Sequence, residues 1–338
     1  MSRRALTLLL ASVLALGLAI AGAVQTVPYV ALTPGPAFNT LGTVGGAQVL
    51  TITGHQTYPT QGALDLTTVS VQDNITLFEA IKGWFSSSEA VLPREIVVPP
   101  DKTEKQNDQE NVQLMQQSQD DATAAALREL GIPSTITVKV VTKGAPAAGH
   151  LKIGDVITSV DGTPVKTADP LRSLISKRAP GKSVVIGYTR GGVPATVTLV
   201  TISSGETTPR AIVGVQLSEV SAVKVNIRLK DVGGPSAGLM FALGIIDKLG
   251  PDSLTGGRNI AGTGEITADG TVGIIGGIAQ KMRGAKAQGA TVFLSPAGNC
   301  KDAKANKPDG ITLVKVSTLK GALAALATLR VGGTPPKC

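Results

Sequence analysis

The sequence has 338 residues, of which 42% are apolar and 17% charged, with a formal net charge of +8. A chain of this length and apolar content can bury a core and corresponds to about two or three domains, which excludes a disordered protein. Two cysteines alone cannot form a structural zinc site, and His55 and His150 are too far apart for a local metal-binding pair, so no metal or cofactor is expected.

The positive charge lies at the C-terminal end. From Lys281 to Cys338 there are ten basic and two acidic residues, whereas the rest of the chain is balanced. This segment holds one aromatic residue, Phe293, and therefore lacks the mixture of basic and stacking side chains that is typical of nucleic-acid binding. We interpret the charges as solvated faces, or alternatively as attraction to an anionic membrane surface, and expect no nucleic-acid partner.

Residues 1–27 predict a membrane anchor. Arg3 and Arg4 precede twenty weakly polar residues, 5–24, about the length that crosses a bilayer as a helix. A cleaved signal peptide is the alternative, because the small residues at 21–23 could be accepted by a signal peptidase. In both cases the basic residues place the N-terminus in the cytoplasm, and we expect a single-pass protein of the cell membrane with its catalytic part outside.

The two cysteines fit that location. An oxidising exterior permits a disulfide between Cys300 and Cys338 that would fix the C-terminal end of the chain. Two unrelated thiols are the alternative.

Residues 28–130 predict a β-rich segment that ends in an amphipathic helix. Apolar and polar residues alternate in runs such as 47–53, with Gly and Pro between the runs, which is typical of short strands. A short helix is expected over residues 74–85. The amphipathic helix is marked by apolar residues at helical spacing: Val112, Met115, Ala122, Ala125 and Leu130.

Residues 131–205 carry a strand, a Gly/Ala/Pro-rich loop, a strand, a helix and a strand. Within them, Gly-Asp-Val-Ile at 154–157 and an Asp-Gly turn at 161–162 resemble bacterial PDZ domains. The resemblance implies binding of extended peptides or C-termini by addition of a strand to a sheet edge. The usual carboxylate-binding loop is not recognisable beyond a weak candidate at 130–132, so a structural module is the alternative.

The sharpest motif lies in the expected C-terminal domain, residues 206–338. Gly-Gly-Pro-Ser-Ala-Gly-Leu at 233–239 precedes an apolar helix, and its spacing matches a nucleophile elbow around Ser236. In that fold the base is a later histidine, but no histidine follows His150. A histidine-dependent esterase is the alternative, and it would have to use His150 as its base.

A lysine can deprotonate a serine if burial lowers the lysine pKa by several units. Lys281 is the best placed, because Ile278 and Ala285 lie three and four residues from it and would share its face of a helix. A solvent-facing lysine is the alternative.

Four motifs follow in order between residues 211 and 327. They are Gly-Pro-Ser-Ala-Gly at 234–238, Gly-Thr-Gly-Glu-Ile-Thr at 262–267, an Asp-Gly turn, and Val-Gly-Ile-Ile-Gly-Gly at 272–277, with a lysine four residues later. This set resembles the proteolytic domain of Lon proteases. With the anchor and the PDZ-like segment, the chain is similar to the membrane-anchored, PDZ-containing Lon-like proteases of bacteria.

The resemblance implies that Ser236 is the nucleophile and Lys281 its general base. Thr263 matches a threonine near this dyad and is expected to hydrogen-bond the lysine amine, with a capped strand hydroxyl as the alternative. Many Lon enzymes carry an acid three residues before the serine, where this chain has Gly233. Asp231 could take that role or could lie in a surface turn.

The neighbours of the serine favour the same site. A helix that begins at Pro235 and Ser236 would leave backbone N–H groups free for an oxyanion hole. Gly234 and Ala237 complete this motif, and glycine lets a substrate chain approach closely. A tight turn packed on the core is the alternative.

No nucleotide site is expected, because the glycines at 144 and 149 are followed by His150 and Leu151 rather than by the lysine and hydroxyl that phosphates need. We therefore predict an α+β protein with a membrane helix, a β-rich segment, a PDZ-like domain and a Lon-type proteolytic domain. Its expected function is ATP-independent serine endopeptidase activity on proteins or peptides outside the cytoplasm. A non-enzymatic peptide-binding or assembly protein is the alternative, and the resemblance implies a homo-oligomer, with six subunits as the number to test.

Overall fold

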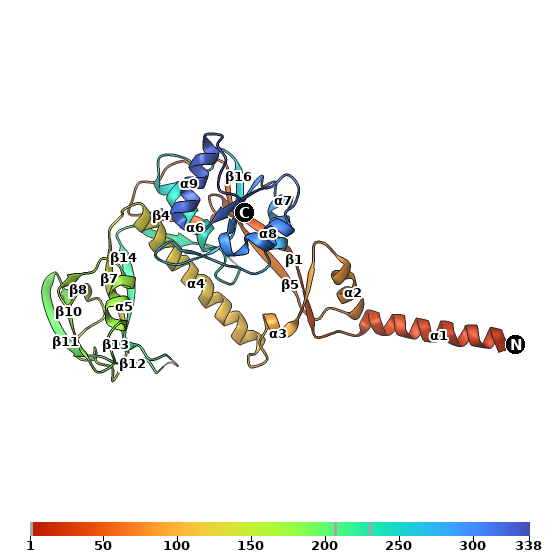
Figure 1. Ribbon diagram of the computed structural model, residues 1–338, viewed down its shortest axis with the longest axis horizontal. Coiled ribbons are helices and arrows are strands. Elements are labelled where there is room, and N and C mark those ends of the chain that lie inside the picture. Colours follow the sequence, from red (N-terminus) through yellow and green to blue (C-terminus); the bar gives the residue numbers. More distant parts are fainter. Residues whose placement is uncertain (1–2, 206–207, 230–231) are drawn as a thin grey trace. The chain divides into compact units, whose positions relative to one another are not determined.

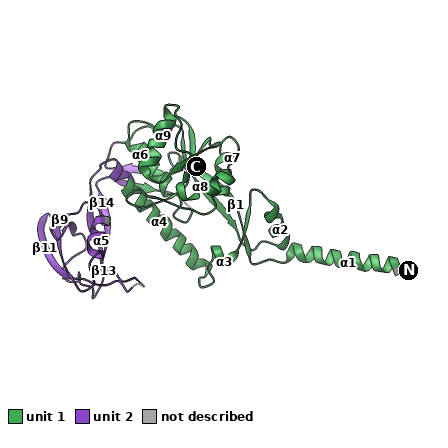
Figure 2. Cartoon of the chain, viewed as in Figure 1, with its two compact units in different colours: residues 1–51, 57–125, 225–338 green, residues 52–56, 126–224 purple. Residues whose placement is uncertain are grey.

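The computed structural model describes residues 3–205, 208–229 and 232–338 (Figure 1). The chain divides into two compact units (Figure 2). Unit 1 comprises residues 1–51, 57–125 and 225–338, and unit 2 comprises residues 52–56 and 126–224. Both units mix helices and strands, which confirms the expected α+β class.

The helices of the described residues are α1 (Arg3–Val24), α2 (Leu77–Phe85), α3 (Arg94–Val97), α4 (Glu104–Glu129), α5 (Ala168–Ser176), α6 (Gly238–Leu249), α7 (Ile278–Ala287), α8 (Cys300–Ala305) and α9 (Leu319–Arg330), with a 3-10 turn at Ala297–Asn299. The first strands are β1 (Tyr29–Asn39), β2 (Thr43–Val44), β3 (Ala47–Gln48), β4 (Leu50–Thr53), β5 (Ala63–Gln72), β6 (Ala90–Pro93), β7 (Ser134–Val141), β8 (Val156–Val160), β9 (Thr163–Pro164) and β10 (Ser183–Arg190). The remaining strands are β11 (Val193–Val200), β12 (Ile202–Ser203), β13 (Ala211–Ile212), β14 (Val215–Ser221), β15 (Lys224–Ile227), β16 (Asn259–Gly262), β17 (Glu265–Ile266), β18 (Val272–Gly273), β19 (Val292–Pro296) and β20 (Thr312–Val316).

The main sheet of unit 1 joins both ends of the sequence. In the described part of the chain its strand order is β20-β19-β16-β5-β1-β6. β1 is antiparallel to β5 and to β6, whereas β5, β16, β19 and β20 run parallel to one another. The N-terminal strands thus form one sheet with strands that follow the PDZ-like segment.

The boundaries expected after residues 130 and 205 differ from these units. The β-rich segment is not separate, because β5 satisfies its backbone by parallel pairing with β16, a partner that lies far away in the sequence. Unit 2 also extends to residue 224, because β14 pairs along its whole length with β7. Chain order alone does not reveal such long-range pairing.

Helices cover both faces of the main sheet. Ala261 and Phe293 lie in one buried cluster with Ile278 and Met282 of α7, so α7 packs on the face to which these strand residues point. Gly262 points to the other face, since successive residues of a strand alternate. A Cβ at Gly262 would lie 2.7 Å from Met240 Sδ of α6, so α6 packs closely on that opposite face.

Unit 2 is built on an antiparallel sheet with the order β11-β10-β8-β7-β14 and with β9 paired to β8, among the described residues. Helix α5 contributes Leu171 and Ile175 to its core. The core residues alternate along β7 and β10, as a half-buried sheet requires. In β8 they are three residues apart, because the register with β10 shifts between Gly187 and Tyr188. They include Ile136, Val138, Ile157, Val160, Val184, Ile186 and Leu199.

The two ends of the chain have distinct features. Within α1, residues 4–24 are long and apolar enough to cross a membrane, a property that a signal sequence near an N-terminus shares. At the other end, Cys300 and Cys338 are joined by a disulfide. The last residues also pair with β20, because Lys315 N–H donates to the Pro336 carbonyl over 2.9 Å.

Candidate active site

Ser236 lies in a turn that leads into α6. Gly234 has a φ of +82°, in the left-handed region that favours glycine, and it lets the chain reverse before the serine. The helix begins at Gly238, with Ala237 as the N-cap, and not at Pro235 and Ser236 as expected from the sequence.

Tertiary hydrogen bonds explain the later helix start. The Ser236 carbonyl accepts from Gly264 N–H at 2.9 Å and from Thr263 Oγ1 at 3.0 Å. Leu239 N–H in turn donates to the Gly264 carbonyl at 3.1 Å. The Ser236 carbonyl could otherwise accept the first hydrogen bond of a helix. Here it binds Thr263 and Gly264 instead and so fixes the serine to the segment that follows β16.

Thr263 directly follows β16 and is fully buried. Its N–H donates to the Leu294 carbonyl of β19 at 3.2 Å, so the sheet itself holds it in place. Helices α6 and α7 cover opposite faces of the sheet. Ser236, two residues before α6, and a side chain from α7 can therefore meet at the carboxyl end of β16.

Lys281 reaches this point from α7. Its Nζ lies 2.7 Å from Ser236 Oγ and 3.2 Å from Thr263 Oγ1, and the residue is only 3% exposed. The helix starts after Gly277, whose φ is +67°, and a Cβ there would lie 2.6 Å from Val69 Cγ1. Glycine at this position thus lets α7 begin close to β5.

Burial sets the protonation of this lysine. Removal from water lowers the pKa of Lys281 from 10.5 to about 8, while the charge of Glu265 acts in the opposite direction. About a tenth of the amine is therefore neutral at pH 7 and about half at pH 8. A neutral amine can accept the proton of the Ser236 hydroxyl, whereas an ammonium group cannot.

Two N–H groups near the serine are available as oxyanion donors. The N–H of Gly234 donates to the Asn111 carbonyl at 3.0 Å, and that of Leu239 is used as described above. The N–H groups of Ser236 and Ala237 donate to no acceptor among the described residues. Backbone donors at such a turn suit a developing negative charge.

Helix α4 holds the serine turn by two hydrogen bonds that no sequence pattern indicated. Ser118 Oγ donates to the Pro235 carbonyl at 2.9 Å, and the Asn111 carbonyl holds Gly234. Ser118 lies in a polar run in which a hydroxyl resembles any solvated side chain. Ser118 is only 3% exposed, and this burial follows from the packing of α4 near α6, which a local sequence pattern does not reveal.

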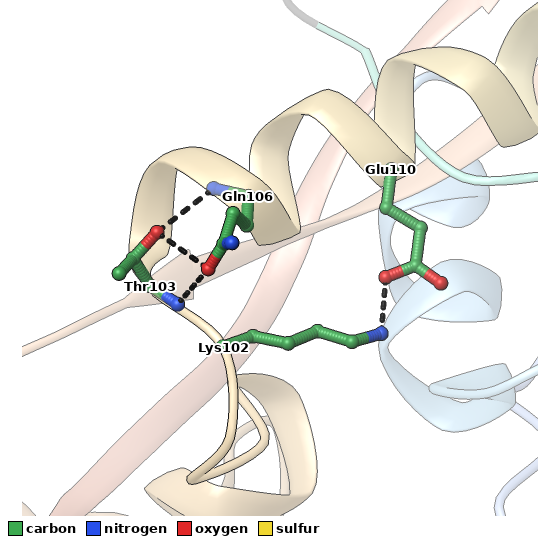
Figure 3. A network of polar contacts seen from close by, with 4 residues as sticks. All are labelled: Lys102, Thr103, Gln106 and Glu110. Atoms are coloured by element: carbon green, nitrogen blue, oxygen red, sulfur yellow. Dashed lines mark hydrogen bonds and ion pairs between the residues drawn. The ribbon is translucent and has the colours of Figure 1, made fainter.

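The start of α4 is itself well fixed (Figure 3). Thr103 and Gln106 form a capping box, in which Gln106 N–H donates to Thr103 Oγ1 and Thr103 N–H donates to Gln106 Oε1. Lys102 forms an ion pair with Glu110 across the first turns. These contacts hold the helix end that precedes Asn111.

Asn299 is a second site residue that the sequence did not indicate. Its Oδ1 accepts from Ile275 N–H and its Nδ2 donates to the Ile275 carbonyl, both at 2.9 Å. This buried amide fixes the segment that leads to α7 and so to Lys281. The other candidate, Asp231, lies outside the described residues, and Gly233 beside it is exposed.

Two segments of the chain match known domain types. Residues 224–327 match the Lon protease (S16) C-terminal proteolytic domain, and residues 105–201 match the PDZ domain. These matches confirm both resemblances seen in the sequence motifs. The PDZ match begins within α4, ahead of the expected boundary at residue 131.

Two curated relatives are Lon proteases. "Lon protease 1" of Sorangium cellulosum (strain So ce56) is 39% identical over 100 residues, which is 29% of this chain and 12% of that protein. "Lon protease" of Mesomycoplasma hyopneumoniae (strain 232) is 44% identical over 69 residues, 20% of this chain and 8% of that protein. The chain thus spans only about a tenth of the length of either relative.

Solved structures of PDZ domains are also similar to part of the chain. The PDZ domain of an SdrC-like protein from Listeria monocytogenes is 25% identical and covers 25% of this chain and 86% of its own, with a TM-score of 0.23. That of an SdrC-like protein from Listeria innocua is 25% identical and covers 25% of this chain and 92% of its own, with a TM-score of 0.23.

Proposed function

We propose that this chain, which contains a Lon-type proteolytic domain and a PDZ domain, is a serine endopeptidase that hydrolyses peptide bonds without ATP. The observation that carries the proposal is the 2.7 Å contact between Lys281 Nζ and Ser236 Oγ. It lies where burial lowers the pKa of the lysine to about 8. A serine beside a largely buried amine is the arrangement that a lysine-activated nucleophile needs.

Each half-reaction moves one proton through Lys281. The neutral amine takes the Ser236 proton as Oγ attacks the substrate carbonyl, and the N–H groups of Ser236 and Ala237 stabilise the oxyanion. The resulting ammonium gives its proton to the leaving amine, and an acyl-enzyme ester remains. Lys281 then takes a proton from the water that attacks the ester, and it gives this proton to Ser236 Oγ as the ester bond breaks. This step releases the new carboxyl end and restores the neutral amine and the free serine. Thr263, at 3.2 Å, keeps the amine in position.

The remaining parts of the chain define the proposed setting. Helix α1 would anchor the protein in the cell membrane as a single span, with the catalytic unit outside the cytoplasm, where the disulfide between Cys300 and Cys338 is stable. ATP is scarce in that compartment, so cleavage would not depend on it. The PDZ domain would bind extended protein or peptide segments along an edge strand of its sheet, β11 or β14, for recruitment or regulation.

The activity is tested with the full chain in detergent and an unstructured protein as substrate. Ser236→Ala and Lys281→Met should each lower cleavage at least about a thousandfold, because the dyad acts as a unit. Lys286→Met is the matched control, since this lysine lies on the same helix but is exposed, and it should cleave like the wild type. Equal fragments from all four proteins would contradict the proposal.

A fluorophosphonate probe separates the peptidase from a non-enzymatic binding protein on the same fold. The wild type should gain one label at Ser236, as seen by mass spectrometry of the peptides, and Lys281→Met should react much more slowly. A wild-type chain that neither reacts nor cleaves in any assembly state would favour the binding protein. Sedimentation of the same preparation tests the proposed homo-oligomer, with a hexamer as the expected species.

A further inference from the structure

Helix α2 carries its apolar side chains on the outside of unit 1. Trp84 is 55% exposed and Phe85 88% exposed. On a helix of 3.6 residues per turn, the exposed apolar residues occupy one continuous arc, which we call the α2 arc. It consists of Leu77, Phe78, Ile81, Trp84 and Phe85.

Packing of the opposite side fixes this orientation. Ala80 and Gly83 are the buried residues of α2, and both are small. A Cβ at Gly83 would lie 2.4 Å from Val91 Cγ2 of β6, so only glycine lets the helix approach this strand. Ala80 lies in a buried cluster with Ala31. Helix α2 therefore cannot turn its larger apolar residues inward without losing this close contact.

The α2 arc begins at the level of the last turn of α1. Leu77 N–H donates to the Gln25 carbonyl at 3.1 Å, directly after the end of α1. The ring of Phe78 packs on Gly22, where an added Cβ would lie 2.9 Å from its Cζ. Figure 1 shows α2 beside the C-terminal end of α1.

We propose that α2 lies in the headgroup region of the bilayer at the outer end of α1 and inserts the α2 arc into lipid. The inference rests on the proposed anchoring by α1, whose 22 residues span about 33 Å, close to the hydrocarbon thickness of a bilayer. Tryptophan and other aromatic side chains favour this depth, and an apolar arc on a short helix is the feature that binds interfaces.

The arc and the active site belong to one packed unit. Trp84 contacts Tyr29 edge to face, with ring centroids 5.7 Å apart. Tyr29 begins β1, and this strand pairs with β5, against which α7 begins. A bilayer that holds α2 would thereby hold the main sheet, and with it α7 and Lys281, at a fixed orientation to the membrane.

Trp84 is the only tryptophan of the chain, so its fluorescence reports on the arc alone. The full chain is reconstituted in phosphatidylcholine and phosphatidylglycerol vesicles with and without lipids brominated at shallow or deep acyl positions. We expect shallow bromines to remove about half of the Trp84 emission and deep bromines clearly less, as for an interfacial helix. Emission that does not depend on the brominated lipids would overturn the proposal.

Two double variants keep Trp84 and serve as a matched pair. Phe78→Ser with Phe85→Ser should abolish most of the quenching, whereas Ile96→Ser with Val112→Ser, which removes two exposed apolar residues outside α2, should leave it unchanged. Equal quenching in both would contradict a role of the α2 arc. Thermal melting of each variant shows that the fold is retained.

A separate measurement distinguishes failure of this inference from failure of the anchor. Wild type and both variants should resist alkaline carbonate extraction, because α1 is unchanged in all of them. Extraction of the wild type would overturn both proposals. A retained chain whose Trp84 is shielded from acrylamide but not quenched by brominated lipid would instead show a protein on the arc, which overturns lipid insertion alone.

Discussion

The two units each bury a charged residue but treat it in opposite ways. In unit 2, Asp155 is 1% exposed and accepts two hydrogen bonds from Arg190, both at 2.7 Å, and one from Lys152 N–H at 2.7 Å. Chiefly because of Arg190, the pKa of Asp155 is lowered and the carboxylate stays charged. In unit 1, Lys281 is just as buried but contacts the neutral hydroxyls of Ser236 and Thr263.

The difference separates a structural charge, Asp155, from the residue that we propose to be reactive, Lys281. A buried ion that meets a bidentate partner recovers much of its desolvation cost and keeps its charge. A buried lysine without a carboxylate at ion-pair distance, as Lys281 is among the described residues, moves toward its neutral form instead. Only a buried lysine without such a partner can act as a base, and its burial lowers the free energy of unfolding of the protein.

Arg190→Met tests the structural charge, because it removes the partner of Asp155. It should lower the local free energy of unfolding of unit 2, because Asp155 would be left buried without its partner. Hydrogen exchange of the amides of β8 and β10 measures the loss. Arg178→Met removes an ion pair with the more exposed Asp161 and should cost less than about 1 kcal/mol. Equal losses would show that burial is not what matters.

The pH dependence of acylation tests the reactive side. Because the proposed base, Lys281, must be neutral and its pKa is lowered to about 8, the rate should level off above that pH. Below it the rate should fall tenfold per pH unit, to about a hundredth at pH 6. Stopped-flow kinetics with a chromogenic ester or peptide gives this profile directly.

Glu265→Gln sharpens the same measurement. The charge of Glu265 raises the pKa of Lys281, so its removal should move the midpoint of the profile to lower pH. An unchanged or higher midpoint would mean that another group controls the rate.

Lys281→Met should stabilise the protein while it abolishes activity. Between pH 8 and 10.5 the unfolded chain binds a proton at Lys281 that the folded chain does not, so wild-type stability rises with pH there. Below pH 8 the wild type bears the full loss of stability that burial of Lys281 causes. The variant should therefore gain about 1 to 3 kcal/mol in free energy of unfolding. Denaturant unfolding followed by Trp84 fluorescence at pH 7 and pH 10.5 checks this, and a gain that persists at the higher pH would contradict it.

Ser118→Ala should have the smallest effect. Loss of its hydrogen bond to the Pro235 carbonyl is worth about 1 kcal/mol, which corresponds to about a fivefold loss in kcat if the turn loosens. A positioning role predicts that KM and the pH midpoint stay unchanged. Thr123→Ala is the matched control, because its hydroxyl bonds only to its own helix and should leave kcat intact.

Local motifs were enough to find the residues that meet at the site, but not what surrounds them. Ser236 and Thr263 stand in glycine-rich motifs whose order is distinctive, and Lys281 follows them at a fixed spacing. A lysine on a helix is ordinarily solvated, and its burial depends on β16, which comes earlier in the chain. Ser118 and Asn299 were missed because an isolated polar residue carries no local signal of a tertiary partner.

For helix α2, the sequence predicted the helix but not which of its sides is buried. Residues 74–85 were expected to form a helix, and the helix is there. Its apolar residues would ordinarily be assigned to the core, because an amphipathic helix usually buries that side. The structure turns them outward, since Gly83 and Ala80 fit the strand beside them more closely.

The sequence by itself determined the domain types, the apolar N-terminal helix and the residue types of the site, because these depend on composition and on short spacings. Tertiary structure alone decided three further points: that β5 and β16 unite the two ends of the chain in one sheet, that α6 and α7 meet at the carboxyl end of β16, and that Lys281 is buried there. The physical reason is that strand pairing and burial depend on partners far away in the sequence, and the lysine pKa follows from that burial.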